Sequence, residues 1–303
     1  MWLAFTLITT LFWSIAELFY KKGARRDERY GHLKICICVG AVMGLHACFT
    51  LLTQDISYDP INLIRYLPVS LCYIVSMAFS FFGVRYIEES ISDPIENTSG
   101  AMCCLMSAVF LGQKISTGSA IAVVIILIGI LGIGFLEKRG DTDRRKVLGK
   151  RMAAVAFSMP FLYALLDALG SFLDIYYLDI ETSPLFNITD ETIEAVANTS
   201  YELSFAFVAL ILLIYIKIRG AKFELPKQRD KIIAAICETG GQFTYVYAMS
   251  GNGAIAAPII SSVCVFSLLL SRIVLKEKLT SKQYCFIALV LLGILLLAII
   301  EGD

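Results

Sequence analysis

The chain has 303 residues, 57% of them hydrophobic, and its 26 basic and 26 acidic residues leave a formal net charge of zero. Its mean hydropathy of +0.73 is higher than a soluble domain of this length can hide in one core. The composition therefore argues against a soluble protein and predicts that a lipid bilayer surrounds much of the chain.

Apolar runs of about 20 residues recur along the chain and are long enough to cross a bilayer as α-helices. A closed barrel also satisfies its backbone in lipid, but barrel strands are about half as long and alternate in polarity. The sequence therefore predicts an all-α integral membrane protein. We expect ten spans, at residues 2–20, 33–52, 62–86, 91–111, 119–136, 152–176, 199–216, 232–249, 253–273 and 283–300.

The segment that begins at Pro94 returns 164 residues later, at Pro258, without a gap. The first copy reads PIENTSGAMCCLMSAVFLGQKIS and the second reads PIISSVCVFSLLLSRIVLKEKLT. Gly129 and Gly293 coincide under the same offset, so the ten helices are expected to form two five-helix repeats. The predicted parts are a first repeat at 1–136, a basic cytoplasmic linker at 137–151, and a second repeat at 152–303 with an external insertion at 177–198.

The basic residues are distributed unevenly between alternate loops. Of the 26, 24 belong to loops on one side of the predicted spans, and only Arg65 and Lys114 fall on the other. The positive-inside rule makes the rich side cytoplasmic, which places both termini outside. Because five spans precede the linker, the second repeat is inverted relative to the first, as in many secondary transporters.

A charged group inside a bilayer is costly, so an acid that remains within a span is a functional candidate. In the first span, Trp13, Glu17 and Tyr20 share one helical face. The first span of the second repeat has the same pattern, with Tyr163 and Asp167 in the positions of Trp13 and Glu17. We therefore interpret these five residues as a repeat-related site for a substrate and protons.

An acid beside aromatic rings suits a cation. The carboxylate supplies the opposite charge, and the ring faces attract an ammonium group by about 1–2 kcal/mol when it is desolvated. A carboxyl group in a low dielectric also holds a proton more readily than it does in water, so it can carry protons. The structural alternative is that these acids lie near helix ends, in vestibule water or beside Lys21.

Four further polar residues are candidates for the same site. Glu96 and Asn97 lie early in the fourth span, where a gate or cavity wall is expected, and Glu238 and Gln242 lie within the eighth span. The alternative for each is a polar contact between packed helices. His46, in the second span, is interpreted as a hydrogen-bonded packing residue, with a proton relay as the alternative.

The nine cysteines all fall inside predicted spans, and their odd number without CxxC spacing argues against disulfides or a zinc site. They are expected to pack as small apolar side chains. The sequence contains no metal-ligand cluster, nucleophile motif or phosphate-binding loop, so we expect neither an enzyme nor a resident cofactor or metal.

Two corresponding stretches resemble a known family. They read GVRYIEESISDPIENTSGAMCCLMSAVFLGQKIS in the first repeat and YAMSGNGAIAAPIISSVCVFSLLLSRIVLKEKLT in the second. They resemble the EamA-like ten-helix branch of the drug/metabolite transporter superfamily, over nearly the whole chain apart from 177–198. The resemblance implies transport of solutes such as amino acids, drugs, sugars, nucleotide sugars or quaternary amines. The context of Glu17 also resembles that of the first-span glutamate of small multidrug resistance proteins.

The expected function is secondary active transport of a small organic cation or zwitterion by alternating access, coupled to protons or to exchange. The expected partners are that substrate, protons and the lipid bilayer, without nucleic acid, for a monomer or homodimer in the cell membrane. One alternative is a carrier of anions or sugars, which would need deep basic residues; Arg65 and Arg85 come closest. A lipid-headgroup flippase and a non-transporting scaffold or receptor are the others.

Overall fold

The computed structural model describes residues 1–23, 28–54, 56–83, 89–137, 150–274 and 279–301. Throughout these ranges the regular structure is helical. In chain order the elements are α1 (Trp2–Gly23), α2 (Gly31–Thr53), α3 (Ile61–Arg65), α4 (Leu67–Gly83), α5 (Glu89–Glu96), α6 (Ser99–Phe110), α7 (Thr117–Glu137), α8 (Lys150–Tyr177), α9 (Ile193–Ile218), η3 (Leu225–Gln228), α10 (Arg229–Ile260), α11 (Val263–Val274) and α12 (Ser281–Glu301).

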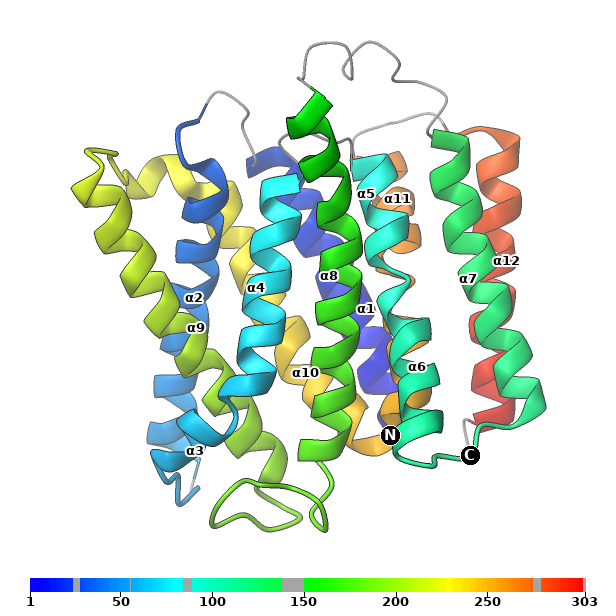
Figure 1. Ribbon diagram of the computed structural model, residues 1–303, viewed down its shortest axis with the longest axis horizontal. Helices are drawn as coiled ribbons and strands as arrows, with labels where there is room; N and C mark the ends of the chain where they lie inside the picture. The colour runs from blue at the N-terminus through cyan, green and yellow to red at the C-terminus, as the bar shows by residue number, and fades with distance from the viewer. Residues whose placement is uncertain (24–27, 55, 84–88, 138–149, 275–278, 302–303) are drawn as a thin grey trace.

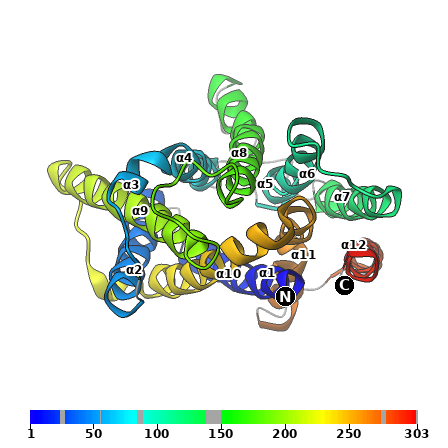
Figure 2. The same cartoon turned by 90° about the horizontal axis from the view of Figure 1, so that it is seen from below.

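Apart from α3 and α9, which lie at the end of the bundle near α2 and α4, the helices stand in two facing rows when they are viewed from one end of the bundle (Figure 2). One row contains α4, α8, α5, α6 and α7, and the other contains α2, α10, α1, α11 and α12. The start of α1 and the end of α12 lie at the same end of the bundle, together with the segment that joins α8 to α9 (Figure 1). A site that uses side chains from both rows must therefore lie between the rows.

Six of the described helices are each long and apolar enough to cross a bilayer, and α10 with α11 adds a seventh if this bent pair is one span. The protein is therefore a multi-pass helical membrane protein, as the sequence predicts. By these criteria the predicted count of ten is not reached. The span expected at 62–86 contains a shorter apolar helix, Leu67–Ser80, and the one expected at 91–111 is divided into α5 and α6.

The breaks in the helices follow the sequence repeat. Pro94 lies inside α5, three residues before the break at 97–98, and Pro258 lies inside α10, three residues before the break at 261–262. Proline removes a backbone donor and bends a helix. The predicted spans at 232–249 and 253–273 also meet within α10, where Asn252 has non-helical φ and ψ of −160° and 67°.

The pair α7 and α12 packs through glycines at repeat-related positions. A Cβ atom on Gly129 would lie 2.3 Å from Cγ2 of Val290, and one on Gly293 would lie 2.7 Å from Cγ1 of Ile126. Small residues permit such close helix contacts in membranes. The two helices are antiparallel, because residues earlier in α7 contact residues later in α12. This pair fixes two helices of the two halves against each other.

Two further antiparallel helix pairs each lie within one of the two rows. In the first pair, Trp2 of α1 lies against Gly251 and Trp13 lies against Gly241 of α10. In the second pair, Tyr73 of α4 lies against Gly170 of α8. Both pairs join a helix from the first half of the chain to a helix from the second, so the side chains between them belong to both halves.

The segment between α8 and α9, which the sequence predicts to be an external insertion, is bound to α3. The side chain of Asn62 donates to the carbonyl of Phe186 (2.9 Å) and accepts from its N–H (2.7 Å). The Arg65 guanidinium donates to the carbonyl of Pro184 (2.7 Å). Helix α9 also begins at Ile193 instead of at 199, so the insertion is shorter than predicted.

Candidate functional site

Four acidic side chains from four helices lie within electrostatic range of one another. Glu17 is on α1, Glu96 on α5, Asp167 on α8 and Glu238 on α10. Glu96 and Glu238 each interact electrostatically with both Glu17 and Asp167. We call these four residues the carboxylate cluster. The sequence predicted all four as site residues, and the fold places them together.

The aromatic face of α1 meets Glu238. The indole Nε1 of Trp13 donates to the main-chain carbonyl of Glu238 (3.2 Å), and the Tyr20 hydroxyl donates to its Oε2 (3.4 Å). A glycine at 241 is needed here, because a Cβ atom there would lie 2.3 Å from Cδ1 of Trp13. Gln242 follows Gly241 and is buried. The helical face predicted from the spacing of α1 is therefore the face that contacts α10.

Asp167 and Glu96 are held by neutral groups. Ser99 and Tyr163 lie within hydrogen-bonding reach of the Asp167 carboxylate. Glu96 accepts hydrogen bonds from Ser80 (2.8 Å) and Ser92 (2.6 Å). Hydroxyl donors orient a carboxylate without neutralising it. Any compensation of these negative charges must therefore come from a proton or from a cation.

Tyr163 lies within electrostatic range of every acid of the carboxylate cluster. Its phenol interacts electrostatically with Asp167, Glu96, Glu238 and Glu17. Glu17, Asp167, Glu238 and Tyr163 are only partly buried, so part of each side chain remains accessible between the helices. Within the described part of the chain, the groups that act on Glu96, Asp167 and Glu238 include no Lys or Arg. The cluster is thus partly accessible, and its acids have hydroxyl groups and one another as neighbours.

Asn97 does not join the carboxylate cluster through any hydrogen bond that the structure shows. Its side-chain amide donates to the main-chain carbonyl of Asp93 (2.7 Å), one turn earlier. The prediction placed Asn97 with Glu96 because both follow Pro94 early in the fourth span, where a gate or cavity wall is expected. Asn97 lies at the break between α5 and α6, whereas Glu96, the last residue of α5, interacts with Glu17 and Asp167.

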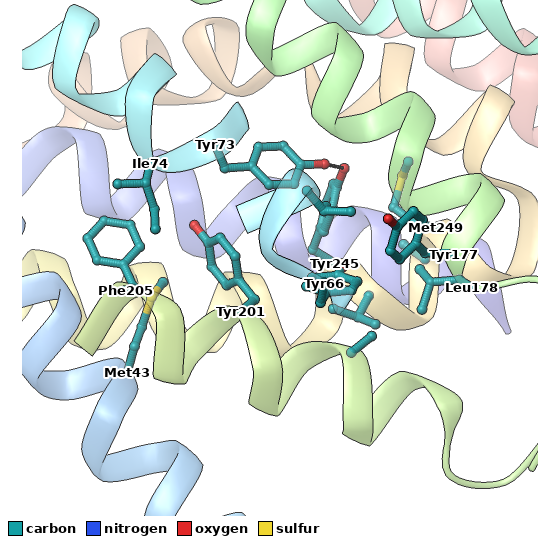
Figure 3. Close-up of a cluster of buried hydrophobic side chains, with 14 of the residues drawn as sticks. Met43, Tyr66, Tyr73, Ile74, Tyr177, Leu178, Tyr201, Phe205, Tyr245 and Met249 are labelled. Carbon is teal, nitrogen blue, oxygen red and sulfur yellow. Dashed lines mark hydrogen bonds between the residues drawn. The ribbon is translucent and has the colours of Figure 1, made fainter. Parts of the chain in front are cut away.

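A fifth acid, Asp174, lies two turns beyond Asp167 on α8 and is fully buried. Tyr66, between α3 and α4, and Tyr73 of α4 both donate hydrogen bonds to its carboxylate, the second at 2.8 Å. The hydroxyl of Tyr73 also meets that of Tyr245 on α10, at 2.7 Å (Figure 3). We call Asp174 with these three tyrosines the tyrosine cage.

The sequence did not identify the tyrosine cage as a site. Asp174 was visible as a residue seven positions after Asp167, and Tyr66 and Tyr73 are also seven positions apart. Seven residues make two helical turns, so each pair lies on one face. That signal could have been read, but only the fold shows that the face of α4 meets that of α8.

A second feature missed by sequence reasoning is the acid that pairs with His46. Nδ1 of His46, on α2, lies 2.8 and 2.9 Å from the two carboxylate oxygens of Glu202, on α9. Asn198 donates to the same carboxylate (3.0 Å), and Glu202 is fully buried. The predicted hydrogen bond of His46 is present, with a carboxylate as its partner, and this pair is compatible with both the packing role and the proton relay.

One acid outside the membrane-spanning segments has a very different environment. Glu28 accepts hydrogen bonds from Lys34 (2.7 Å) and Lys231 (2.6 Å), and Lys231 also donates to Gln228 (2.7 Å). Burial by itself would raise the pKa of the Glu28 carboxyl, but the hydrogen bonds and charges of the two lysines hold it below its ordinary value. We call Glu28, Lys34 and Lys231 the lysine triad. It lies beside a hollow of about 400 Å³.

The apolar spans and the acidic side chains between them define a class, that of a multi-pass membrane protein with ionisable groups inside its helical bundle. The EamA-like transporter family model matches residues 1–135 and 182–299. The chain belongs to this family, and so to the drug/metabolite transporter superfamily, as the sequence motifs predicted.

Comparison with solved structures finds one whose overall fold is similar to that of this chain. A crystal structure described only as that of a protein aligns with a TM-score of 0.73, covering 99% of this chain and 97% of the other. The two sequences are 12% identical, so the likeness concerns the fold alone. A search of curated proteins found no match to the sequence.

Proposed function

We propose that this protein is a secondary active transporter of a small organic cation or zwitterion, coupled to protons or to exchange. The observation that carries the proposal is the carboxylate cluster: four acids from four helices, flanked by aromatic rings. Carboxylates in a low dielectric attract a cation strongly, and aromatic faces add about 1–2 kcal/mol for a desolvated ammonium group. Membrane transport itself follows from membership of the family.

The proposal includes ten helices arranged as two inverted five-helix repeats, 1–136 and 152–303, joined by the linker 137–151. The opposite directions of α7 and α12, and the corresponding breaks after Pro94 and Pro258, support this arrangement. The charge asymmetry of the loops supports a position in the cell membrane with both termini outside. Labelling of an engineered cysteine at Asp179, but not at Lys217, by an impermeant reagent on intact cells would agree with this topology.

The coupling would arise from competition at the carboxylate cluster. A bound cation compensates at least one carboxylate, and a proton does the same after the cation has left. An uncompensated charge is costly to move through a low-dielectric region. Helices from both halves contribute to the cluster, so a rocking motion of the halves would expose it to either side in turn.

The alternatives predict other site chemistry. An anion or nucleotide-sugar carrier would place Lys or Arg beside its substrate, whereas the groups described around Glu96, Asp167 and Glu238 are hydroxyls and acids. A flippase for cationic headgroups would share the acidic site, and transport of a short water-soluble amine would argue against it. A scaffold or receptor would show no substrate flux.

Ligand binding provides the first test. The melting temperature of the purified protein is measured with organic cations such as tetraphenylphosphonium and hexylamine. The same measurement is made with nucleotides and with neutral sugars for comparison. A ligand at 100 times its dissociation constant stabilises the folded protein by about 2.7 kcal/mol. Stabilisation by cations alone is expected; stabilisation by nucleotides alone would overturn the cation proposal.

Transport in proteoliposomes provides the second test. We expect the native protein to drive uptake of a stabilising cation when a proton gradient is imposed. The Glu17→Gln variant should fold and lose proton-driven uptake, because its amide cannot exchange a proton for the cation. Full, gradient-dependent uptake by this variant would contradict the mechanism.

A further inference from the structure

We propose that the substrate is a linear diamine or polyamine, whose two amino groups are bound by the carboxylate cluster and by Asp174. This inference rests on the proposed function and names the substrate class of that site. The starting observation is that α8 carries two acids, Asp167 and Asp174, that face separate polar environments in the same bundle. Each acid could receive one positive charge.

The spacing of the two acids sets the length of the ligand. Seven residues separate them along a continuous helix, which corresponds to a rise of about 10 Å on one face. An extended aliphatic chain advances about 3.5 Å for every three bonds, as an extended backbone does. A diamine with about seven or eight methylene groups would therefore reach from one acid to the other.

The tyrosine cage suits an ammonium group. Asp174 is fully buried, and the groups that act on it in the described residues are tyrosine hydroxyls and Asp167, without a Lys or Arg. A buried carboxylate needs a proton or a cation as compensation. A primary ammonium group also donates three hydrogen bonds, which suits an environment rich in hydroxyl acceptors.

An independent observation is a polar side chain without a partner beside the cage. Ser70 is fully buried, and among the described residues its Oγ has no hydrogen-bond partner. It lies four residues after Tyr66 and three before Tyr73, on the face of α4 that contacts Asp174. A buried hydroxyl is normally hydrogen-bonded. An ammonium donor between α4 and α8 would supply the missing bond.

The two environments also differ in accessibility, which assigns an order to binding. Asp167 is partly accessible, whereas Asp174 is closed off by its tyrosines. The first amino group would meet the carboxylate cluster, and the second would enter the cage when Tyr66 or Tyr73 releases Asp174. A monoamine could fill only the first position, so chain length becomes the criterion of selectivity.

The test is a chain-length series on the purified full-length protein. Competition with tetraphenylphosphonium measures the affinity of α,ω-diamines with about four to ten methylene groups, and of monoamines of equal length. We expect the diamine affinity to peak near seven or eight methylene groups, about tenfold or more above the matched monoamine, because a second charged contact is added. The Asp174→Asn variant should lose the peak and keep its monoamine affinity within about threefold.

Two further variants are measured in the same chain-length series, one that retains the charge at position 174 and one control elsewhere. Asp174→Glu retains the charge on a longer side chain and should shift the preferred chain length, which remains measurable if Asp174→Asn fails to fold. Glu202→Gln removes a buried acid outside both positions and should leave the peak unchanged. Equal affinities for monoamines and diamines at every length would overturn the diamine inference alone. Failure of every amine and of tetraphenylphosphonium to bind would instead overturn the proposed function.

Discussion

The lysine triad and the carboxylate cluster both contain acids at contacts between the two halves of the chain. The two sites differ in the groups that surround the carboxylates. Glu28 is bonded to Lys34 and Lys231, so its charge is neutralised by permanent partners. Glu96, Asp167 and Glu238 are surrounded by hydroxyls and other acids in the described residues. A paired acid therefore stabilises the fold, whereas an acid without a permanent cationic partner is available to a mobile cation.

The largest expected effect separates binding from stability at the carboxylate cluster. Asp167→Asn removes a charge that would contact the cation, so affinity for tetraphenylphosphonium should fall by about 3 kcal/mol, roughly a hundredfold. Thermal stability without ligand should be unchanged or higher, because repulsion with the other acids is relieved. Isothermal titration and thermal melting measure the two effects. A large loss of stability with unchanged affinity would assign Asp167 a structural role.

The lysine triad should show the reverse behaviour. Glu28→Gln leaves Lys231, which is 2% exposed, without its carboxylate partner. We expect a loss of about 2 kcal/mol of stability, between the values typical of exposed and buried pairs. Cation affinity should stay within about threefold of the native value. Denaturant unfolding in detergent provides the measurement, and Glu224→Gln is a control in a more exposed ion pair.

The packing of α7 against α12 lies outside the lysine triad and the carboxylate cluster, so a substitution there is a control for both. Gly129→Ala would place a methyl group 2.3 Å from Cγ2 of Val290, so neighbouring atoms must shift. Overpacking of this kind typically costs about 1–3 kcal/mol, and an alanine belongs at the lower end. Affinity for the cation should not change. A variant that folds normally but loses binding would show that this pair takes part in the site.

The smallest expected effect is the acid dependence of the lysine triad. The folded-state pKa of Glu28 is lowered, so its contribution to stability is present above the ordinary pKa of Glu, near 4.3, and is lost as the pH falls through the lowered value. The native protein should therefore lose more stability between about pH 5 and pH 3 than Glu28→Gln does. Equal losses in both proteins would contradict this account of Glu28.

The sequence predicted the polar residues of α1 and α8 better than their surroundings. The repeated spacing of an aromatic residue and an acid identified Glu17 and Asp167, because a helical period determines which residues share a face. It could not show that the face of α8 meets Tyr73, since a single helix carries no information on its neighbour. Glu202 was missed because the predicted span began at 199, which placed this acid at a helix end instead of within α9.

The boundaries of the spans were predicted less well than their existence. Hydropathy locates apolar runs, and six such runs are long helices in the described residues. It does not show where a helix is interrupted while the chain stays apolar. The division of 91–111 into α5 and α6, and the junction at Asn252, depend on local backbone geometry and tertiary packing.

The most direct test of the central claim is the number of protons released when a cation binds. Tetraphenylphosphonium is added to the purified protein in weak buffer with a pH indicator, and bound cation is measured in parallel. If cation and proton compete for the carboxylate cluster, the native protein should release up to about one proton per bound cation at a pH where the cluster is partly protonated. Glu17→Gln and Asp167→Asn should release less, and Glu202→Gln should match the native protein. Stoichiometric binding without proton release at any pH at which the protein is folded would contradict the account.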